Sequence, residues 1–159
     1  GDVYKRQVET TSVDLAKRSR ELSTAHFEAN GFSMGNHRLV VMDVFDYFKY
    51  AKKKGLSYDL IVIDPPSFAR NKKRTFSANK DYHKLIAQSL DILSEHGTII
   101  ASTNAANMTV QQFKKQLRKG LGDVTADFVN LQQLPADFTV NPNDPTSNYL
   151  KVYTIKVNK

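Results

Sequence analysis

The chain contains no cysteine and no tryptophan among its 159 residues. Without cysteine no disulfide framework can form, which suits a cytoplasmic protein, and no thiolate is available as a nucleophile. No apolar run approaches the roughly 20 residues of a membrane span, so we expect none within this sequence. The four histidines lack metal-ligand spacing and have no cysteine companions, and we therefore expect no metal site; they are His26, His37, His83 and His96.

What the chain does contain is typical of a globular domain, with 40% hydrophobic and 25% charged residues. Its length suffices for one ordinary domain but not for two sizeable ones. The formal net charge of +7 favours a polyanionic partner such as RNA. A basic surface that serves only to keep the protein solvated explains that charge equally well.

The first seven residues differ in character from the rest of the chain. Asp2 to Gln7 resembles a translated transposon adapter of the kind used in sequencing libraries, so we interpret residues 1–7 as a non-native scar. The domain then occupies residues 8–159, and the native protein is expected to have further residues upstream. A genuine polar N-terminal tail is the alternative.

Strand-like and helix-like stretches alternate from Val8 onward, which predicts a parallel α/β sheet. Residues 58–63 (YDLIVI) form the clearest strand, a continuous aliphatic run expected to be buried on both faces. Residues 67–80 are expected to form a polar, basic loop. The remaining predicted strands are 8–13, 38–42 and 97–102, and the predicted helices are 16–30, 45–51, 81–94 and 109–119, the last with Thr109 as its N-cap. Residues 124–131 and 149–157 alternate as antiparallel strands do.

Three carboxylates, Asp14, Asp43 and Asp64, each follow a predicted strand. Ligands of open α/β sheets bind beyond the carboxyl ends of the strands, where these side chains would meet. A carboxylate after the second strand of such a unit can accept hydrogen bonds from both hydroxyls of a ribose. Each aspartate could instead be a helix cap beside a strand end.

Asp64-Pro65-Pro66 forms an unusually stiff exit from its strand. Each proline fixes its own φ and restricts the residue before it, so the turn can hold the Asp64 carboxylate in place without a later ordering cost. Phe68 offers an aromatic face on which a base could stack. The alternative is a purely structural turn with Asp64 as a cap and Phe68 in the core.

These segments together resemble a known family. Residues 61–72 (IVIDPPSFARNK) resemble motif IV of the class I methyltransferases that modify large-subunit ribosomal RNA with S-adenosylmethionine. Asp14-Leu15 resembles the family's ribose-binding segment, Asp43-Val44 its adenine-side segment, and residues 148–151 (NYLK) its last strand. The resemblance covers residues 8–159. It implies a Rossmann-like sheet, mostly parallel, with an antiparallel C-terminal strand pair.

The resemblance also implies roles for individual residues. Asp14, Leu15, Asp43, Val44 and Asp64 would bind S-adenosylmethionine. Asp64, Pro65, Pro66 and Phe68 would line the pocket in which the target base, most simply one of 23S rRNA, meets the methyl donor. The family's first strand and glycine-rich loop would precede residue 8. We therefore expect this chain alone to bind the cofactor poorly and to be inactive.

Besides lacking the glycine-rich loop, the sequence departs from the family pattern at a residue that bears on which atom is methylated. Family members that methylate cytosine C5 use a cysteine thiolate, and Asn104 stands in its place here. A relative that methylates guanine N7 needs no thiolate, because a ring nitrogen attacks the methyl group directly. The family thus includes 23S rRNA methyltransferases that act on cytosine C5 and others that act on guanine N7. Of these two reactions, the sequence favours methylation of guanine N7.

A run of basic residues follows the Asp-Pro-Pro turn directly. Arg70, Lys72, Lys73 and Arg74 are expected to contact RNA phosphates, although such runs are often only solvated surface. Two other functions stay open: a non-catalytic RNA- or nucleotide-binding α/β module, and a small-molecule methyltransferase.

Overall fold

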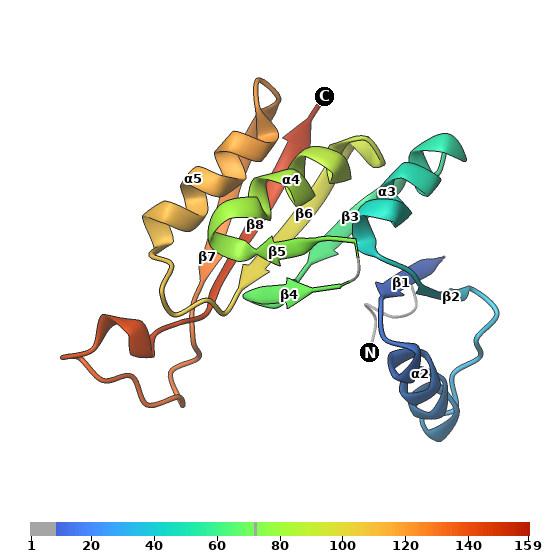
Figure 1. Cartoon of the computed structure of the whole chain (residues 1–159), viewed down its shortest axis with the longest axis horizontal. Coiled ribbons are helices and arrows are strands. Elements are labelled where there is room, and N and C mark those ends of the chain that lie inside the picture. Colours follow the sequence, from blue (N-terminus) through green and yellow to red (C-terminus); the bar gives the residue numbers. More distant parts are fainter. Residues whose placement is uncertain (1–8, 72) are drawn as a thin grey trace. The chain divides into compact units, whose positions relative to one another are not determined.

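The computed structural model describes residues 9–71 and 73–159 and separates into two units between Tyr50 and Ala51 (Figure 1). The interpretation of residues 1–7 as a scar, and the expected RNA contact of Lys72, lie outside the described residues. Helix α3, Val44–Lys53, begins in the first unit and ends in the second. None of the helices in the described part of the chain has the length and apolarity needed to cross a bilayer.

The first unit is built on two parallel strands. β1 (Thr10–Asp14) pairs with β2 (His37–Val41), with Thr10 opposite His37 and Asp14 opposite Val41. Helix α2 (Lys17–Ala29) connects them, as the sequence predicts for a βαβ unit. None of its residues is buried, because its sequence is rich in charged and hydroxyl side chains.

The second unit contains a four-stranded sheet in the order β3-β6-β8-β7. β3 (Tyr58–Ile63) runs parallel to β6 (Leu93–Thr103), with Ile63 opposite Ala101. β8 (Lys151–Asn158) is antiparallel to both β6 and β7 (Thr125–Gln132), which confirms the predicted antiparallel C-terminal pair. The segment between β7 and β8 contains a short 3-10 helix, Pro145–Ser147.

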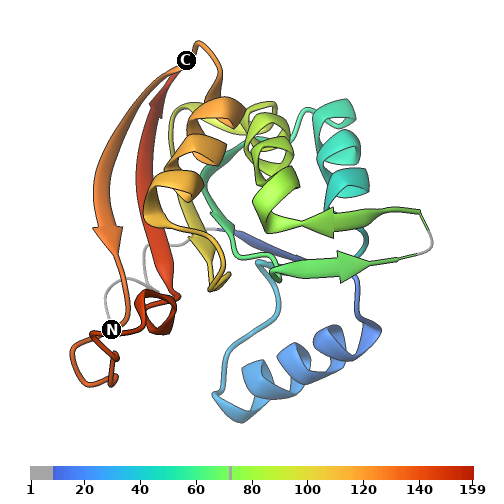
Figure 2. The same cartoon turned by 60° about the vertical axis from the view of Figure 1, so that its left-hand side comes forward.

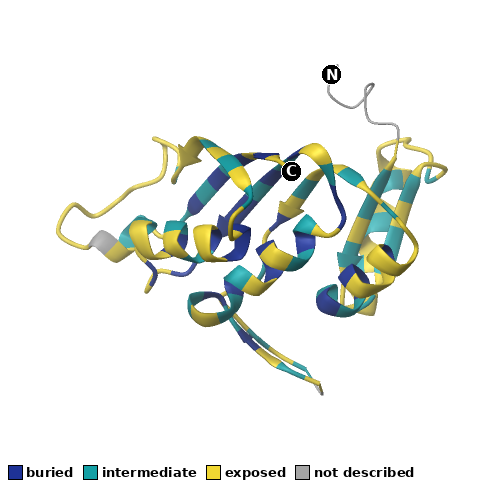
Figure 3. Cartoon of the chain, turned by 90° about the horizontal axis from the view of Figure 1, so that it is seen from above, coloured by how far each residue is buried: buried dark blue, intermediate teal, exposed yellow. Residues whose placement is uncertain are grey.

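Two helices cover one face of this sheet (Figure 3). They are α4 (Ala78–Leu90) and α5 (Val110–Leu121). The core between helices and sheet includes Tyr82, Phe113, Ile99 and Ile155, all fully inaccessible to solvent. The rings of Tyr82 and Phe113 meet edge to face with centroids 4.9 Å apart, an arrangement that aromatic pairs prefer.

The expectation that β3 is buried on both faces is wrong. Ile63 is buried, but Leu60 and Val62 are 48% and 62% exposed. Successive side chains of a strand point to opposite faces. Leu60 and Val62 therefore share one face of β3, and the buried Ile63 lies on the other. Within the described residues of the second unit, α4 and α5 cover only one face of the sheet (Figure 3).

The segment predicted as a loop over residues 67–80 is also different in the structure. It contains an antiparallel hairpin of β4 (Phe68–Arg70) and β5 (Thr75–Ser77), and α4 then begins at Ala78 rather than at residue 81. Figures 2 and 3 show this hairpin extending away from the sheet and helices of the second unit. Its strands are too short to give a recognisable alternation in the sequence.

Two further element boundaries can be compared with the prediction: the end of α4, where the prediction is wrong, and the start of α5, where the predicted cap is confirmed. α4 ends at Leu90, and β6 already begins at Leu93, where the sequence predicts helix to residue 94. Thr109 is the N-cap of α5, as predicted: its hydroxyl accepts the Gln112 N–H at 3.1 Å, and the Gln112 side chain accepts the Thr109 N–H at 2.8 Å.

Candidate active site

Two of the three predicted carboxylates share an edge of the first unit. Asp14 is the last residue of β1, and Asp43 lies two residues beyond the end of β2. The Met42 N–H donates to the Asp14 carbonyl at 3.0 Å, which fixes the two chain segments side by side. The parallel pairing thus brings Asp14 and Asp43 together, as expected for side chains at the ends of neighbouring parallel strands.

Both carboxylates also accept hydrogen bonds from the backbone that follows them. Asp14 Oδ1 accepts the Ala16 N–H at 2.8 Å, and Asp43 Oδ1 accepts the N–H groups of Phe45 and Asp46 at 3.0 and 3.4 Å. Asp43 thereby caps the start of α3, as the structural alternative supposes. The N-cap of α2 is Ala16 and receives no side-chain bond, so Asp14 is not a helix cap. Asp14 Oδ2 has no hydrogen-bond partner among the described residues.

A cavity of about 160 Å³ adjoins Asp14. Its walls include Val13, Ser19, Arg20 and Leu39 from β1, α2 and β2. Of the neighbouring predicted cofactor residues, Leu15 is exposed and Val44 is half-buried at the start of α3. Arg20 could not be singled out from the sequence, where it is one of several cations on a polar helix.

The third carboxylate, Asp64, lies in the second unit at the end of β3. Its Oδ1 accepts a 2.8 Å hydrogen bond from the Ser102 hydroxyl on the neighbouring strand β6. Because Pro65 and Pro66 have no N–H to donate, the chain leaves the sheet here and turns into the hairpin. Asp64 is thus held by the strand beside it and by the stiffness of the turn after it.

Tyr82 of α4 joins the two strand ends. Its hydroxyl lies 2.8 Å from the carbonyl oxygens of Ile63 and Ser102 and donates its proton between them. Burial raises the pKa of Tyr82 well above its usual value, so the hydroxyl stays a donor throughout the physiological range. In the sequence, Tyr82 does not stand apart from the apolar residues of its helix.

Asn104 lies beside the Asp-Pro-Pro turn. Its Oδ1 accepts a 2.8 Å hydrogen bond from the Ser67 hydroxyl, although the two residues are 37 positions apart in sequence. Both side chains are exposed. The structure therefore brings together Asp64 and Ser67 from the end of β3 with Ser102 and Asn104 from the end of β6.

A buried lysine supports the loop that carries Asn104. Lys151 is only 3% exposed, and its ammonium donates to the carbonyl oxygens of Ala105 and Tyr149 at 2.8 and 2.7 Å. Among the described residues it has no carboxylate partner. Burial lowers the pKa of Lys151 from its usual 10.5. The sequence indicated Lys151 only as part of a family-like strand, without a role.

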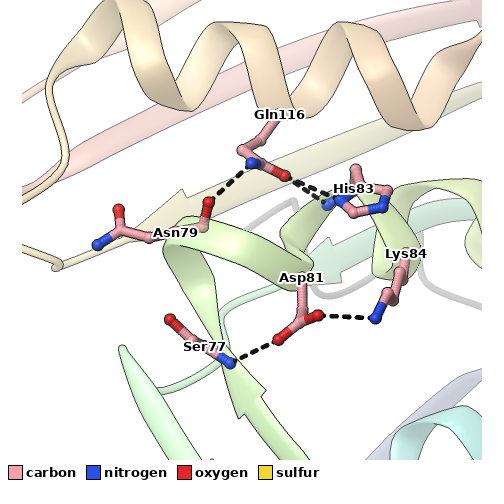
Figure 4. A network of polar contacts seen from close by, with 6 residues as sticks. All are labelled: Ser77, Asn79, Asp81, His83, Lys84 and Gln116. Carbon is pink, nitrogen blue, oxygen red and sulfur yellow. Dashed lines mark hydrogen bonds and ion pairs between the residues drawn. The ribbon is translucent and has the colours of Figure 1, made fainter.

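The hairpin of β4 and β5 is anchored at its base to α4 (Figure 4). The Ser77 N–H donates to Asp81 Oδ2 at 3.0 Å, while Lys84 contacts Asp81 Oδ1 at 2.7 Å. Gln116 of α5 contacts two further residues of α4. Its side-chain oxygen accepts from His83, and its side-chain nitrogen donates to the Asn79 carbonyl at 2.7 Å. These contacts fix both helices at the base of the hairpin.

The hairpin carries the described members of the predicted RNA-binding set. Arg70 and Lys73 are exposed and Arg74 is half-buried. Asn71 Oδ1 accepts the N–H groups of Lys73 and Arg74 at 2.8 and 2.9 Å, which shapes the turn at the hairpin tip. Among the described residues, no group of three or more potential ligands is placed to hold a metal ion.

Phe68 lies on the solvent-exposed side of the hairpin. It is 63% exposed, whereas Phe76 on the partner strand is buried. The alternative that Phe68 belongs to the core is therefore wrong, and its ring is available for stacking on a planar group.

Comparison with known proteins agrees with these features. The family model of S-adenosylmethionine-dependent methyltransferases matches residues 5–150. The chain belongs to this family. S-Adenosylmethionine is thus its family cofactor.

The chain is also similar in sequence to individual methyltransferases. YwbD of Bacillus subtilis, whose name places it among the ribosomal RNA large subunit methyltransferases, is 42% identical over 92% of the chain. Ribosomal RNA large subunit methyltransferase I of Klebsiella pneumoniae is 26% identical over 94%. The chain spans 38% of the length of each of these relatives.

Solved structures confirm the predicted α/β methyltransferase fold. The crystal structure of the methyltransferase SMU.776 complexed with SAH superposes with a TM-score of 0.90 at 70% identity, over 94% of this chain and 39% of that one. A methyltransferase from Streptococcus mutans gives a TM-score of 0.86 at 67% identity, over 94% of this chain and 38% of its own.

Proposed function

We propose that this chain provides most of the catalytic site of an enzyme that methylates a base of large-subunit ribosomal RNA, specifically 23S rRNA. The observation that carries the proposal is the fixed group at the end of β3, where Ser102 donates to Asp64 and Ser67 donates to Asn104. The exposed Phe68 follows Ser67 directly in the chain. The names of the relatives YwbD and methyltransferase I support ribosomal RNA as the substrate class.

S-Adenosylmethionine supplies an electrophilic methyl group when bound. In the first unit, Asp14 is assigned to the ribose through its unpaired Oδ2, while Asp43 and Val44 are assigned to the adenine side. Leu15 offers an exposed apolar contact beside them. In the second unit, the rigid Asp64-Pro65-Pro66 turn is assigned to the target base and the methyl group, and the exposed Phe68 to stacking on that base.

The methylated atom is assigned to a ring nitrogen, guanine N7, rather than to cytosine C5. Methylation at C5 requires a nucleophile that adds to the ring, and the chain contains no cysteine. Asn104 stands where the cytosine C5 methyltransferases of the family have their cysteine, and its amide cannot add to the ring. A ring nitrogen has its own lone pair, so the protein only needs to orient the base and exclude water.

We assign residues 8–159 to part of a larger catalytic domain. β3 is an edge strand of its sheet although it is highly apolar, and the face of Leu60 and Val62 is exposed. Parallel strands are normally covered on both faces. A further strand beside β3 and a helix over that face, with a glycine-rich turn for the cofactor, would complete the sheet, and the isolated chain is then expected to be inactive or nearly so.

The basic hairpin is assigned to RNA phosphates. Arg70 is the last residue of β4, and Lys73 and Arg74 lie between β4 and β5, close in sequence to the Asp-Pro-Pro turn. Lys72 is assigned to RNA phosphates together with these three residues. A non-catalytic nucleotide-binding module is not favoured, because the chain belongs to a methyltransferase family.

Deletion of the gene followed by mass spectrometry of large-subunit rRNA nucleosides tests this function in the source organism. The proposal expects one 7-methylguanosine to disappear and to return when the gene is restored, but not when the restored gene encodes Asp64→Asn. Loss of a 5-methylcytidine instead would contradict the nitrogen assignment. An unchanged set of methylated nucleosides would contradict the function itself.

A further inference from the structure

The hydrogen bond between Ser67 and Asn104 gives the exposed amide a defined polarity. The Ser67 hydroxyl donates to Asn104 Oδ1 at 2.8 Å, so the amide oxygen faces Ser67. The Asn104 NH₂ group points the other way and has no hydrogen-bond partner among the described residues. At the rim of the proposed base pocket, Asn104 therefore presents its donors, while its oxygen is turned towards Ser67 and already accepts one hydrogen bond.

The loop around Asn104 is held firmly enough for this polarity to matter. Lys151 binds the Ala105 carbonyl at 2.8 Å, and the Ala105 N–H donates to Thr103 Oγ1 at 3.3 Å. The Met108 N–H closes a turn onto the same Ala105 carbonyl at 3.1 Å, and the Met108 side chain is buried. Because the loop is already ordered, a ligand loses little by binding to it.

Guanine and adenine differ in what they present next to N7. Guanine carries the acceptor O6 there, whereas adenine carries an amino donor. An asparagine commonly reads adenine with both amide atoms, its oxygen accepting from the amino group and its nitrogen donating to N7. Ser67 turns the Asn104 oxygen aside and so opposes this two-point reading of adenine, whereas the amide N–H groups remain free to donate to the keto oxygen O6 of guanine.

We propose that Asn104, held by Ser67, is a specificity-determining residue that donates a hydrogen bond to O6 of the target guanine and rejects adenine. This inference rests on the proposed function and adds to it the means of base selection. Asn104 orients the base and takes no part in bond making. Ser67 is a positioning residue, because it acts only through Asn104.

Binding of short single-stranded RNAs tests the inference without requiring catalysis by the isolated chain. Oligonucleotides that differ only in one central purine, guanine, hypoxanthine or adenine, are titrated by fluorescence anisotropy. Hypoxanthine keeps O6 but lacks the 2-amino group. The protein is expected to bind the guanine and hypoxanthine oligonucleotides equally and about tenfold more tightly than the adenine one.

Two variants report on the mechanism of that preference. Asn104→Asp keeps an oxygen that accepts from Ser67 but removes both donors, so the preference should disappear or reverse towards adenine. Ser67→Ala frees the amide to rotate and should reduce the preference by raising the affinity for adenine. Asn107→Asp is the matched control, since it adds the same charge to an exposed residue of the same loop and should leave the preference intact.

An unchanged guanine preference in Asn104→Asp would overturn the inference, as would equal binding of all three oligonucleotides by the unaltered protein. Either result leaves RNA methylation standing, because transfer of labelled methyl groups to rRNA is measured separately. If the protein neither bound RNA nor methylated rRNA, the proposed function would fail and this inference with it. Thermal unfolding of each variant shows that an altered preference does not come from loss of the fold.

Discussion

The Ser102 hydroxyl donates a 2.8 Å hydrogen bond to Asp64 Oδ1 and so links the ends of β6 and β3. Ser102→Ala removes this donor while leaving the strand pairing in place. In the enzyme that contains this chain, we expect the free energy of unfolding to fall by about 1 kcal/mol and methyl transfer to fall about tenfold, because the carboxylate loses its fixed orientation. Ser94→Ala at the start of β6 is the control and should change neither. Full activity in Ser102→Ala would contradict the orienting role.

Tyr82→Phe tests the buried link between the two strand ends. The change leaves the carbonyl oxygens of Ile63 and Ser102 without their donor, so we expect the free energy of unfolding to fall by roughly 1–3 kcal/mol. Tyr50→Phe, at an exposed tyrosine, should cost much less. Denaturant unfolding compares them, and equal stabilities of the two variants would refute the link.

The pKa of Tyr82 adds a pH dependence of known sign. Burial holds the native pKa above the usual 10.0, so above that pH the unfolded chain loses this proton before the native protein does. The free energy of unfolding should therefore fall as pH rises past about 10, and less steeply in Tyr82→Phe. Identical slopes in the two proteins would show that Tyr82 does not titrate differently in the native state.

Lys151 predicts a pH dependence of the opposite sign. Burial lowers its native pKa below 10.5, so between the native and unfolded values the unfolded chain binds more protons. In that alkaline pH range the contribution of Lys151 to the free energy of unfolding should increase as the pH rises. Lys151→Met should remove this contribution. Lys156→Met, at an exposed lysine of the same strand, should keep it. Taking the difference between variant and unaltered protein cancels the tyrosine contribution.

The basic hairpin predicts a change in salt dependence. Replacing Lys72, Lys73 and Arg74 by glutamine should lower the slope of log affinity for single-stranded RNA against log salt by up to roughly 0.7 for each phosphate that the variant no longer binds. Glutamine at Lys52, Lys53 and Lys54 removes the same charge at the end of α3 and should leave the slope nearly unchanged. Equal effects of both triple variants would indicate that net charge, rather than direct binding by the hairpin, sets the salt dependence.

Local sequence patterns predicted much of this fold. The YDLIVI run indicated β3 with correct bounds, and the strand-end aspartates of β1 and β2 do share an edge, because parallel pairing follows from the alternation of strands and helices. The Thr109 cap followed from its side-chain chemistry. The hairpin of β4 and β5 could not be predicted, since three-residue strands carry almost no periodic signal.

Within the candidate site, the sequence identified Asp64 and Asn104 but not the residues that hold them. Ser102, Tyr82 and Lys151 act across strands through hydrogen bonds between residues 38, 19 and 46 positions apart. Nothing in their own neighbourhood distinguishes such a serine, tyrosine or lysine from any other. The exposure of Leu60 and Val62 was missed for a similar reason, because an apolar run shows the preference for burial but not what covers it.

Transfer of labelled methyl groups from S-adenosylmethionine to purified large-subunit rRNA measures the proposed reaction itself. The enzyme that contains this chain is compared with Asp64→Asn and with Asp59→Asn, a change of the same kind at an exposed aspartate of the same strand. We predict label in 7-methylguanosine, at least a hundredfold loss in Asp64→Asn, as for removal of a principal group of an active site, and full activity in Asp59→Asn. Equal activity of the two variants, or label in 5-methylcytidine, would contradict the assigned role of Asp64 or the assigned methylated atom.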